Sequence, residues 1–497
     1  MATCQINEKG FGLSCPLPAL ESDPEGLCIL HSPIIDKDKV AFESALKDKV
    51  SQKYFNFRAV VFPSDVSFSG QILAEADFAN ATFYGRADFQ KSVFSGKADF
   101  SKAIFQEADF SKAAFQNADF TEATFNKANF SYTNFQDGRF SGATFQEASF
   151  NEAIFKEVIF FRATFQNASF YRATFQNANY TGARFHRVSF IGSNFQGLSF
   201  SATFHKADFT DATFQNANFF MATFQDVTLW GVKINGLVIF GQTRLESTPK
   251  RMDLRFIKFG DTGVLRLKNL SLARAKFAAT DLRRVEFHNI EWQRFWGRNA
   301  VYDEVLLFEQ KIDRLSYTMQ QGFIAEIFPF EKLINKPDHP TYEQYLEVEK
   351  LYRYLKINYE EERDLKSVGN FYYGEMEMHR RANPWRQLLP ISWHNLYHEL
   401  SGYGEGPSRS LIWLLIFLFG LSALVWWCGI AVDNYGNLAG FWESFIYILQ
   451  KATLQRPDWP KPITWGGRFL SSLSVLLLPG QAALFILALR NRLGRRR

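Results

Sequence analysis

The chain has 497 residues, which is long for one domain and predicts more than one structural unit. Hydrophobic residues make up 46%, charged residues 22%, and 54 residues are Phe, a composition that excludes wholesale disorder. The net charge of +5 is too small to indicate a nucleic-acid partner. The first 30 residues contain no apolar run behind a basic start, so we expect no secretory signal and a cytoplasmic N-terminus.

Three of the four cysteines lie in an N-terminal segment, residues 1–50, and a histidine follows the third. The set is Cys4, Cys15, Cys28 and His31. Three thiolates and one imidazole can supply the ligands of a tetrahedral zinc site, and the C-x2-H spacing at its end is typical of one. The C-x10-C spacing at its start is longer than usual. We predict a structural zinc site here; the alternative is free cysteines in a tail rich in Pro and Gly.

A five-residue repeat fills the next part of the chain. From Phe100 to Phe200 every fifth residue is Phe except Tyr180, and a small residue, usually Ala, stands two positions before each aromatic. A period of five scatters side chains around a helix and alternates them between the faces of a flat strand. All of them face inward if the chain turns a corner every five residues and four sides close one coil. The repeat therefore predicts a solenoid with a core ladder of Phe rings, represented by Phe100, Phe120, Phe150, Phe170 and Phe200.

Runs such as ADFSKAIFQEADFSKAAF resemble the pentapeptide-repeat proteins. The resemblance implies a mainly β fold, a right-handed four-sided β-helix, over roughly residues 57–293. The repeat covers 57–240, about nine coils at ~20 residues each, then breaks near 241–263 and returns as a second short stretch at 264–293. The mixed polar residues at outward positions predict a solvated surface or a docking face for a cytoplasmic protein partner. No phosphate loop, G-x-S-x-G or H-E-x-x-H motif is present, so we expect no enzymatic activity and no nucleic-acid binding.

After the repeats, Phe becomes rarer and we expect a helical connector over residues 294–400. A helix is predicted from Ala300 to about Gln321, before a linker marked by prolines. An amphipathic helix is predicted over 342–365, where apolar residues recur at i, i+3 and i+4. Gly369 is expected to end or hinge this helix, before a second helix over 371–381.

Two uncharged runs, residues 411–432 and 469–489, are 22 and 21 residues long. Each is long enough to cross a hydrocarbon layer of ~30 Å. The tail at 490–497 contains five Arg, and further arginines precede the first run. By the positive-inside rule we expect a multi-pass protein of the inner or plasma membrane, with both termini in the cytoplasm.

Between the two runs, residues 440–454 predict a half-length helix that re-enters the membrane. The order of helix, half-helix, loop and helix resembles the pore region of two-span cation channels. The resemblance implies a homo-oligomer, a tetramer by analogy, because one hairpin cannot enclose a pore. Its candidate pore-lining residues are Glu443, Thr453, Gln455, Arg456, Gly480 and Gln481. No run like Thr-Val-Gly-Tyr-Gly follows the half-helix, so potassium selectivity is not predicted.

The sequence thus supports two hypotheses for function. The first is an oligomeric, ion-channel-like pore whose cytoplasmic β-helix acts as a sensor or interaction platform. The alternative is a non-conducting protein-interaction scaffold, in which the hairpin is a plain two-helix anchor in the lipid bilayer with an interfacial half-helix.

Overall fold

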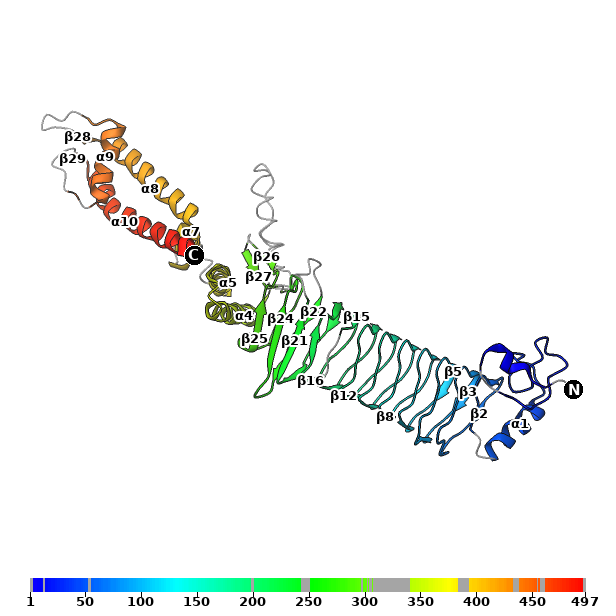
Figure 1. The fold of residues 1–497 in the computed structure, drawn as a ribbon. Helices are drawn as coiled ribbons and strands as arrows, with labels where there is room; N and C mark the ends of the chain where they lie inside the picture. Colours follow the sequence, from blue (N-terminus) through cyan, green and yellow to red (C-terminus); the bar gives the residue numbers. More distant parts are fainter. Residues whose placement is uncertain are drawn as a thin grey trace. The chain divides into compact units, whose positions relative to one another are not determined.

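The computed structural model describes residues 3–11, 14–51, 55–197, 201–242, 251–295, 298–301, 303, 306, 340–382, 393–431, 438–453, 455 and 461–494. The chain divides into two compact units. The first comprises Met1–Gln293 and Val301–Asp303, and the second comprises Arg294–Ala300 and Glu304–Arg497. The N-terminal segment and the long series of strands belong to the first unit, and the connector and hairpin helices belong to the second (Figure 1).

The N-terminal segment contains little regular structure. A 3-10 helix, η1, covers Gln5–Lys9, and an α-helix, α1, covers Lys39–Ser51. The amides of Val40 and Ala41 donate to one carboxylate oxygen of Asp38, which caps the start of α1. Two isolated antiparallel bridges, Thr3↔Pro18 and Ala19↔Cys28, hold the loops between η1 and α1.

Short parallel strands then recur about every ten residues and alternate between two sheets. The first sheet consists of β1 (Val61–Phe62), β2 (Val66–Ser67), β3 (Thr82–Asp88), β5 (Ile104–Asp109), β7 (Thr124–Asn126), β9 (Thr144–Gln146), β11 (Thr164–Gln166), β13 (Arg184–His186), β15 (Thr203–His205) and β18 (Thr223–Gln225). The second consists of β4 (Val93–Phe94), β6 (Ala114–Gln116), β8 (Asn134–Gln136), β10 (Ile154–Lys156), β12 (Thr174–Gln176), β14 (Asn194–Gln196), β16 (Thr213–Gln215), β20 (Lys233–Asn235) and β23 (Lys258–Phe259).

The register of these sheets shows that one coil has four sides and 20 residues. Phe125 pairs with Phe145 in the first sheet, and Phe135 pairs with Phe155 in the second. Isolated parallel bridges such as Asp99↔Asp119 and Asn129↔Ser149 form the two remaining sides. The result is the predicted β-solenoid, which has about 11 turns.

The solenoid interior is a stack of aromatic rings. The rings of Phe130 and Phe150 lie 4.9 Å apart and nearly parallel, and those of Phe150 and Phe170 lie 4.7 Å apart. Neighbouring columns meet edge to face, as Phe145 and Phe150 do at 5.1 Å. The ladder positions Phe100, Phe120, Phe150 and Phe170 are fully buried. The fifth ladder position, Phe200, lies outside the described residues.

The polar residue before each Phe makes the corner of the coil. One carboxylate oxygen of Asp119 accepts the amide of Thr121 at 2.9 Å, and the side-chain oxygen of Asn129 accepts the amide of Ser131 at 3.0 Å. This side-chain turn bends the chain directly after the buried ring. The preference for Asp, Asn, Ser or Thr at this position therefore follows from backbone geometry.

The last coils lie where the sequence predicted a break, and this prediction is corrected by the strand pairing. Two further sheets contain β17 (Asn218–Phe220), β21 (Leu237–Gly241), β24 (Val264–Lys268) and β25 (Val285–His288), and β19 (Val227–Thr228) and β22 (Met252–Asp253). β22 pairs with β19, β23 with β20, and β24 with β21, so 264–293 continues the same solenoid. Leu and Ile replace Phe in this part of the core, which hid the repeat. A 3-10 helix, η2, covers Leu282–Arg284.

The connector begins with a two-stranded sheet of β26 (Gln293–Phe295) and β27 (Arg298–Ala300). The helix predicted from Ala300 to Gln321 lies almost entirely outside the described residues. Helix α4 covers Tyr342–Glu361 and starts at a capping box formed by Thr341 and Gln344. Helix α5 covers Leu365–Ala382 and packs on α4, with the rings of Tyr359 and Phe371 5.3 Å apart.

Gly369 neither ends α4 nor acts as a hinge. The chain turns at Arg363, which has a φ of 60°, and the carboxylate of Asp364 accepts the amides of Lys366 and Ser367 at the start of α5. Gly369 is a buried position inside α5. The capping Asp carries the boundary, and the glycine allows close helix packing instead.

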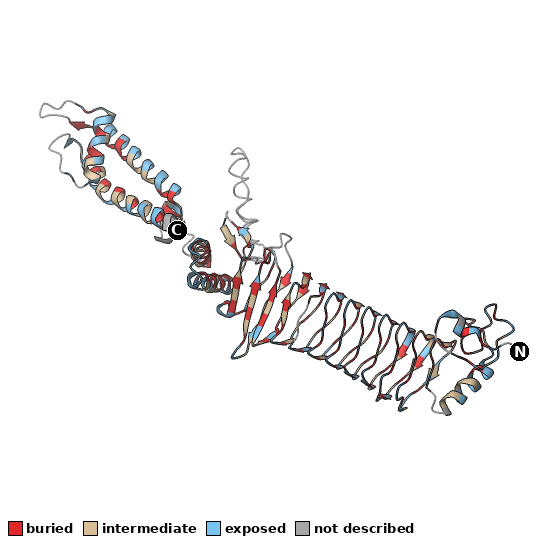
Figure 2. Ribbon diagram, viewed as in Figure 1, coloured by how far each residue is buried: buried red, intermediate tan, exposed pale blue. Residues whose placement is uncertain are grey.

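The C-terminal hairpin consists of α7 (Trp393–Ser401), α8 (Pro407–Cys428), β28 (Ile430–Ala431), α9 (Phe441–Ala452), β29 (Lys461–Pro462) and α10 (Trp465–Gly494). By length and composition, α8 and residues 465–491 of α10 can each cross a membrane. Only 17% and 22% of their most apolar windows are buried, which differs from the core helix of a soluble protein (Figure 2). Both helices begin four residues before the predicted spans.

Helix α9 is the predicted half-helix, and it packs against both long helices. Tyr447 and Ile448 of α9 are buried in a cluster with Leu421 and Val425 of α8 and Leu478 of α10. The opposite face of α9 exposes Trp442, Ile446 and Leu449. The half-helix is therefore amphipathic with respect to its own hairpin.

Candidate functional site

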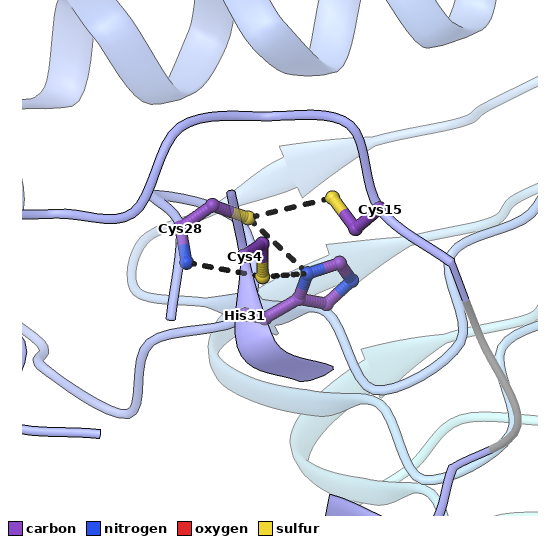
Figure 3. Close-up of side chains that lie close together, drawn as sticks. All are labelled: Cys4, Cys15, Cys28 and His31. Carbon is purple, nitrogen blue, oxygen red and sulfur yellow. Dashed lines mark hydrogen bonds between the residues drawn. The ribbon is translucent and has the colours of Figure 1, made fainter. Parts of the chain in front are cut away.

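Four side chains of the N-terminal segment converge, and we call Cys4, Cys15, Cys28 and His31 the Cys3His cluster (Figure 3). Their ligand atoms all lie within 4.8 Å of one another. The sulfurs of Cys15 and Cys28 are 3.7 Å apart. Nδ1 of His31 lies 3.2 Å from the sulfur of Cys28 and 3.5 Å from the sulfur of Cys4.

Backbone contacts bring these residues together from three separate stretches of chain. The amide of Cys4 donates to the carbonyl of Leu17, and the amide of Cys28 donates to the sulfur of Cys4 at 3.3 Å. The amide of His31 donates to the carbonyl of Cys28 at 3.0 Å, which closes a tight turn. This turn places the imidazole against the thiol three residues before it, and it explains the C-x2-H spacing.

The spacing of the ligand atoms fits a tetrahedral zinc ion. Zn–S bonds of about 2.3 Å separate two sulfur ligands by about 3.8 Å, and a sulfur and a nitrogen ligand by about 3.5 Å. The observed separations of 3.7 Å between Cys15 and Cys28 and 3.5 Å between Cys4 and His31 match these edges. The donor set of three thiols and one imidazole is also typical of structural zinc.

Two lysines supply positive charge near the thiols. Burial lowers the pKa of Lys37 to about 8, against the attraction of Cys28. Burial also lowers the pKa of Lys49, against the attraction of Cys15 and Cys28. Within the cluster, the hydrogen bond from Cys28 lowers the pKa of Cys15, and the same contact raises that of Cys28. A thiolate is thus favoured at Cys15, the form that binds metal.

A pocket of about 690 Å³ opens between the cluster and α1. Its lining includes Cys15 and His31, together with Asp48 and Lys49 of α1. An ion can therefore reach the cluster from one side, as a metal site requires. Among the described residues, Nε2 of His31 is buried without a hydrogen-bond partner. That atom carries the proton when Nδ1 binds a metal.

The candidate pore residues lie at separate places on the hairpin. Glu443 is exposed in the first turn of α9, Thr453 and Gln455 are exposed after its end, and Gly480 is exposed on α10. The Thr453 hydroxyl donates to the carbonyls of Leu449 and Gln450. Arg456 lies outside the described residues.

Gln481 differs from its predicted place on a pore axis. It is 2% exposed, and its side-chain amide donates to the carbonyls of Leu400 at 3.0 Å and Ser410 at 2.9 Å. It ties α10 to the end of α7 and the start of α8. A polar group in an apolar helix is satisfied here within its own chain, which is a solution that the sequence pattern did not indicate.

The sequence analysis also missed a buried ion network in the connector. Glu377 is 2% exposed and accepts hydrogen bonds from Arg380, Arg381 and the hydroxyl of Tyr403. Burial and the neighbouring charge of Glu377 raise the pKa of Tyr403. The i+3 and i+4 spacing of the two arginines was a visible signal. The contact with Tyr403, 26 residues away, had none.

Comparison with known proteins identifies the repeats. Family models described as "Pentapeptide repeat region", "Pentapeptide repeats (9 copies)" and "Pentapeptide repeats (8 copies)" match residues 163–239, 78–124 with 110–154, and 139–177, respectively. The predicted resemblance is thereby confirmed over 78–239. A comparison with curated proteins found no match.

Several solved structures are similar to part of the chain. HetL, a pentapeptide repeat protein involved in heterocyst differentiation regulation from the cyanobacterium Nostoc, is 17% identical, covers 47% of this chain and 95% of its own, and has a TM-score of 0.19. QnrB1, a plasmid-mediated fluoroquinolone resistance protein, is 16% identical over 53% of this chain and 99% of its own, with a TM-score of 0.19. A pentapeptide repeat protein from the Arabidopsis thaliana thylakoid lumen is 25% identical over 24% and 68%, with a TM-score of 0.10.

Proposed function

From the pentapeptide-repeat domain that this chain carries, we propose a protein-interaction scaffold held at a membrane by the C-terminal hairpin. The observation that carries this proposal is the filled interior of the solenoid. Stacked Phe rings occupy the centre of the described coils, so binding falls to the outer surface. The partner we propose is a cytoplasmic protein, and the chain acts as a scaffold rather than an enzyme.

The proposed membrane anchor rests on the outward faces of the two long helices. Ile412 and Ile416 of α8 and Leu476 and Ile486 of α10 are exposed, and an apolar surface of this kind suits lipid. The arginines that flank both helices place the two termini in the cytoplasm of an inner or plasma membrane. After an alkaline carbonate wash, the full chain should stay in the membrane pellet. Its release into the supernatant would contradict anchoring.

The partner is tested by photo-crosslinking in native membranes. A photoreactive residue is placed at Ile159 or at Tyr171, both exposed on the solenoid. The control position is Ile416, on the exposed face of α8. We expect a defined adduct with another protein from the solenoid positions and none from the control. Adducts formed only between copies of this chain would contradict the scaffold.

An oligomeric ion-channel-like pore is the second candidate function. It is supported by α9, a half-length helix that packs against both long helices through Ser444, Tyr447 and Ile448. A pore needs several copies, four by analogy with two-span channels, because one hairpin cannot enclose it. The mass in detergent and the conductance of reconstituted protein test this candidate. A monomer without conductance would leave the anchor alone.

We also propose that the Cys3His cluster holds one structural zinc ion. The ligand spacing, the nearby lysines and the accessible pocket support it. Elemental analysis of full-length protein purified under reducing conditions should give about one zinc per chain. The Cys15→Ser variant should lose it, whereas Cys428→Ser, which changes the fourth cysteine outside the cluster, should keep it. Less than about a tenth of an equivalent in the unaltered chain would contradict the site.

A further inference from the structure

The first strand of the solenoid has an edge that faces the N-terminal segment. On one side β1 pairs with β3, with Val61 opposite Thr82. On the other side the amide of Val61 donates to the carbonyl of Leu30 at 2.8 Å. The ammonium group of Lys37 donates to the carbonyl of Val61 at 3.0 Å. The segment therefore satisfies the outer backbone groups of Val61, which in an open sheet attract another strand.

The same segment also covers the end of the aromatic core. The ring of Phe42, from α1, meets the ring of Phe62 edge to face at 5.9 Å, and both are buried. Phe62 in turn stacks on Phe83 of the next coil at 4.3 Å. Phe42 thus occupies the side of Phe62 where the ring of a preceding coil would lie. Without this cover, the first coil would present an apolar end to solvent.

The contacts that close the edge depend on the turn that carries two of the metal ligands. Leu30 lies between Cys28 and His31, and its carbonyl is the acceptor for Val61. The backbone bonds that shape this turn are those from His31 and Ser32 to the carbonyl of Cys28. Such a short segment with little regular structure depends on its metal for a fixed conformation. Losing the ligation therefore frees the residue that pairs with β1.

We propose that the β1 edge is a zinc-controlled interaction surface. When the Cys3His cluster holds zinc, residues 28–42 close the edge and the core end. When zinc is lost, the edge opens and pairs with the same edge of a second copy of this chain. A second copy fits because a two-fold pairing joins two identical open edges and two identical apolar ends, which bury each other. The inference rests on the proposed zinc site.

The test compares full-length protein in detergent, loaded with zinc or stripped by a chelator, with Cys428→Ser as the matched control. Three quantities are measured: zinc per chain, hydrogen exchange in peptides covering 57–62 and 143–155, and mass by sedimentation at two protein concentrations. On zinc removal we expect exchange at 57–62 to rise by about tenfold or more, exchange at 143–155 to stay constant, and the mass to double relative to the zinc form. The Cys15→Ser variant should behave like the stripped protein.

Each other outcome contradicts a defined part of the reasoning. No zinc in the unaltered chain would overturn the zinc site itself. Bound zinc whose removal leaves exchange at 57–62 unchanged would overturn the closed edge while the zinc site stands. Faster exchange at both 57–62 and 143–155 would mean that zinc supports the whole solenoid rather than its end. An open edge without an increase in mass would overturn pairing with a second copy.

Discussion

Replacing Phe150 by Asp tests the register on which the solenoid core depends. The ring of Phe150 is fully buried and lies within 6.0 Å of five other rings, those of Phe130, Phe145, Phe155, Phe165 and Phe170. Removing a buried Phe side chain costs about 3–5 kcal/mol, and a buried carboxylate without a partner adds several kcal/mol. The total approaches the whole stability of an ordinary domain, ~5–15 kcal/mol. We therefore expect the coils around this position to unfold.

The matched control is Gln146→Asp, four residues earlier on the outer face of β9. Gln146 is exposed, and its neighbours across the sheet are Asn126 and Gln166, so no like charge stands opposite the new carboxylate. Its effect should stay within about 0.5 kcal/mol. Phe150→Leu, which keeps an apolar side chain, should remain folded and lose about 1–3 kcal/mol. Hydrogen exchange of the full chain in detergent measures all three, and equal effects of Phe150→Asp and Gln146→Asp would refute the inward register.

Three further substitutions test contacts outside the core ladder. Lys37→Met removes the hydrogen bond to Val61 but no metal ligand, so zinc content should stay constant while exchange at 57–62 rises roughly fivefold, the equivalent of about 1 kcal/mol; loss of zinc would show that Lys37 acts on the cluster instead. Glu377→Gln leaves two buried arginines without their carboxylate and should destabilise the connector by about 3–5 kcal/mol, measured by exchange in α5, whereas Glu360→Gln on the exposed face of α4 should have no effect. Gln481→Leu should lower the melting temperature of the hairpin through the loss of two hydrogen bonds, about 1 kcal/mol each; a change in conductance at unchanged stability would instead place Gln481 on a pore.

Strict periodicity is the reason that the solenoid was predictable from the sequence. A Phe at every fifth position admits only a four-sided coil, because every other regular conformation exposes part of the ladder. Where Leu, Met and Ile replace Phe, after Gly241, the same coil continues without its signature. The predicted break near 241–263 was therefore a loss of signal in the sequence and not in the strand pairing.

Contacts between distant residues explain what was not predicted. Cys28 and His31 were recognised because one turn sets their spacing, and Cys4 and Cys15 were added only by residue type. The closure of the β1 edge joins Leu30 to Val61, and the pairing of Gln481 with Leu400 spans 81 residues. Such pairs leave no periodic trace. For Gly369, local propensity suggested a helix end, but Asp364 supplied a stronger start signal a few residues earlier.

The same regularity that fixes the core leaves the outer surface free to vary. In each five-residue unit the aromatic and the small residue face inward, and the polar residue before the aromatic shapes the corner. Only the remaining positions can change without cost to the fold, so recognition by the solenoid must be carried by them. The ends of the solenoid obey a different constraint, because a coil without a neighbour leaves backbone groups and rings uncovered. At the N-terminal end the chain meets that constraint with a segment shaped by four metal-binding side chains. Control of an interaction is therefore more readily built at this end than along the uniform sides.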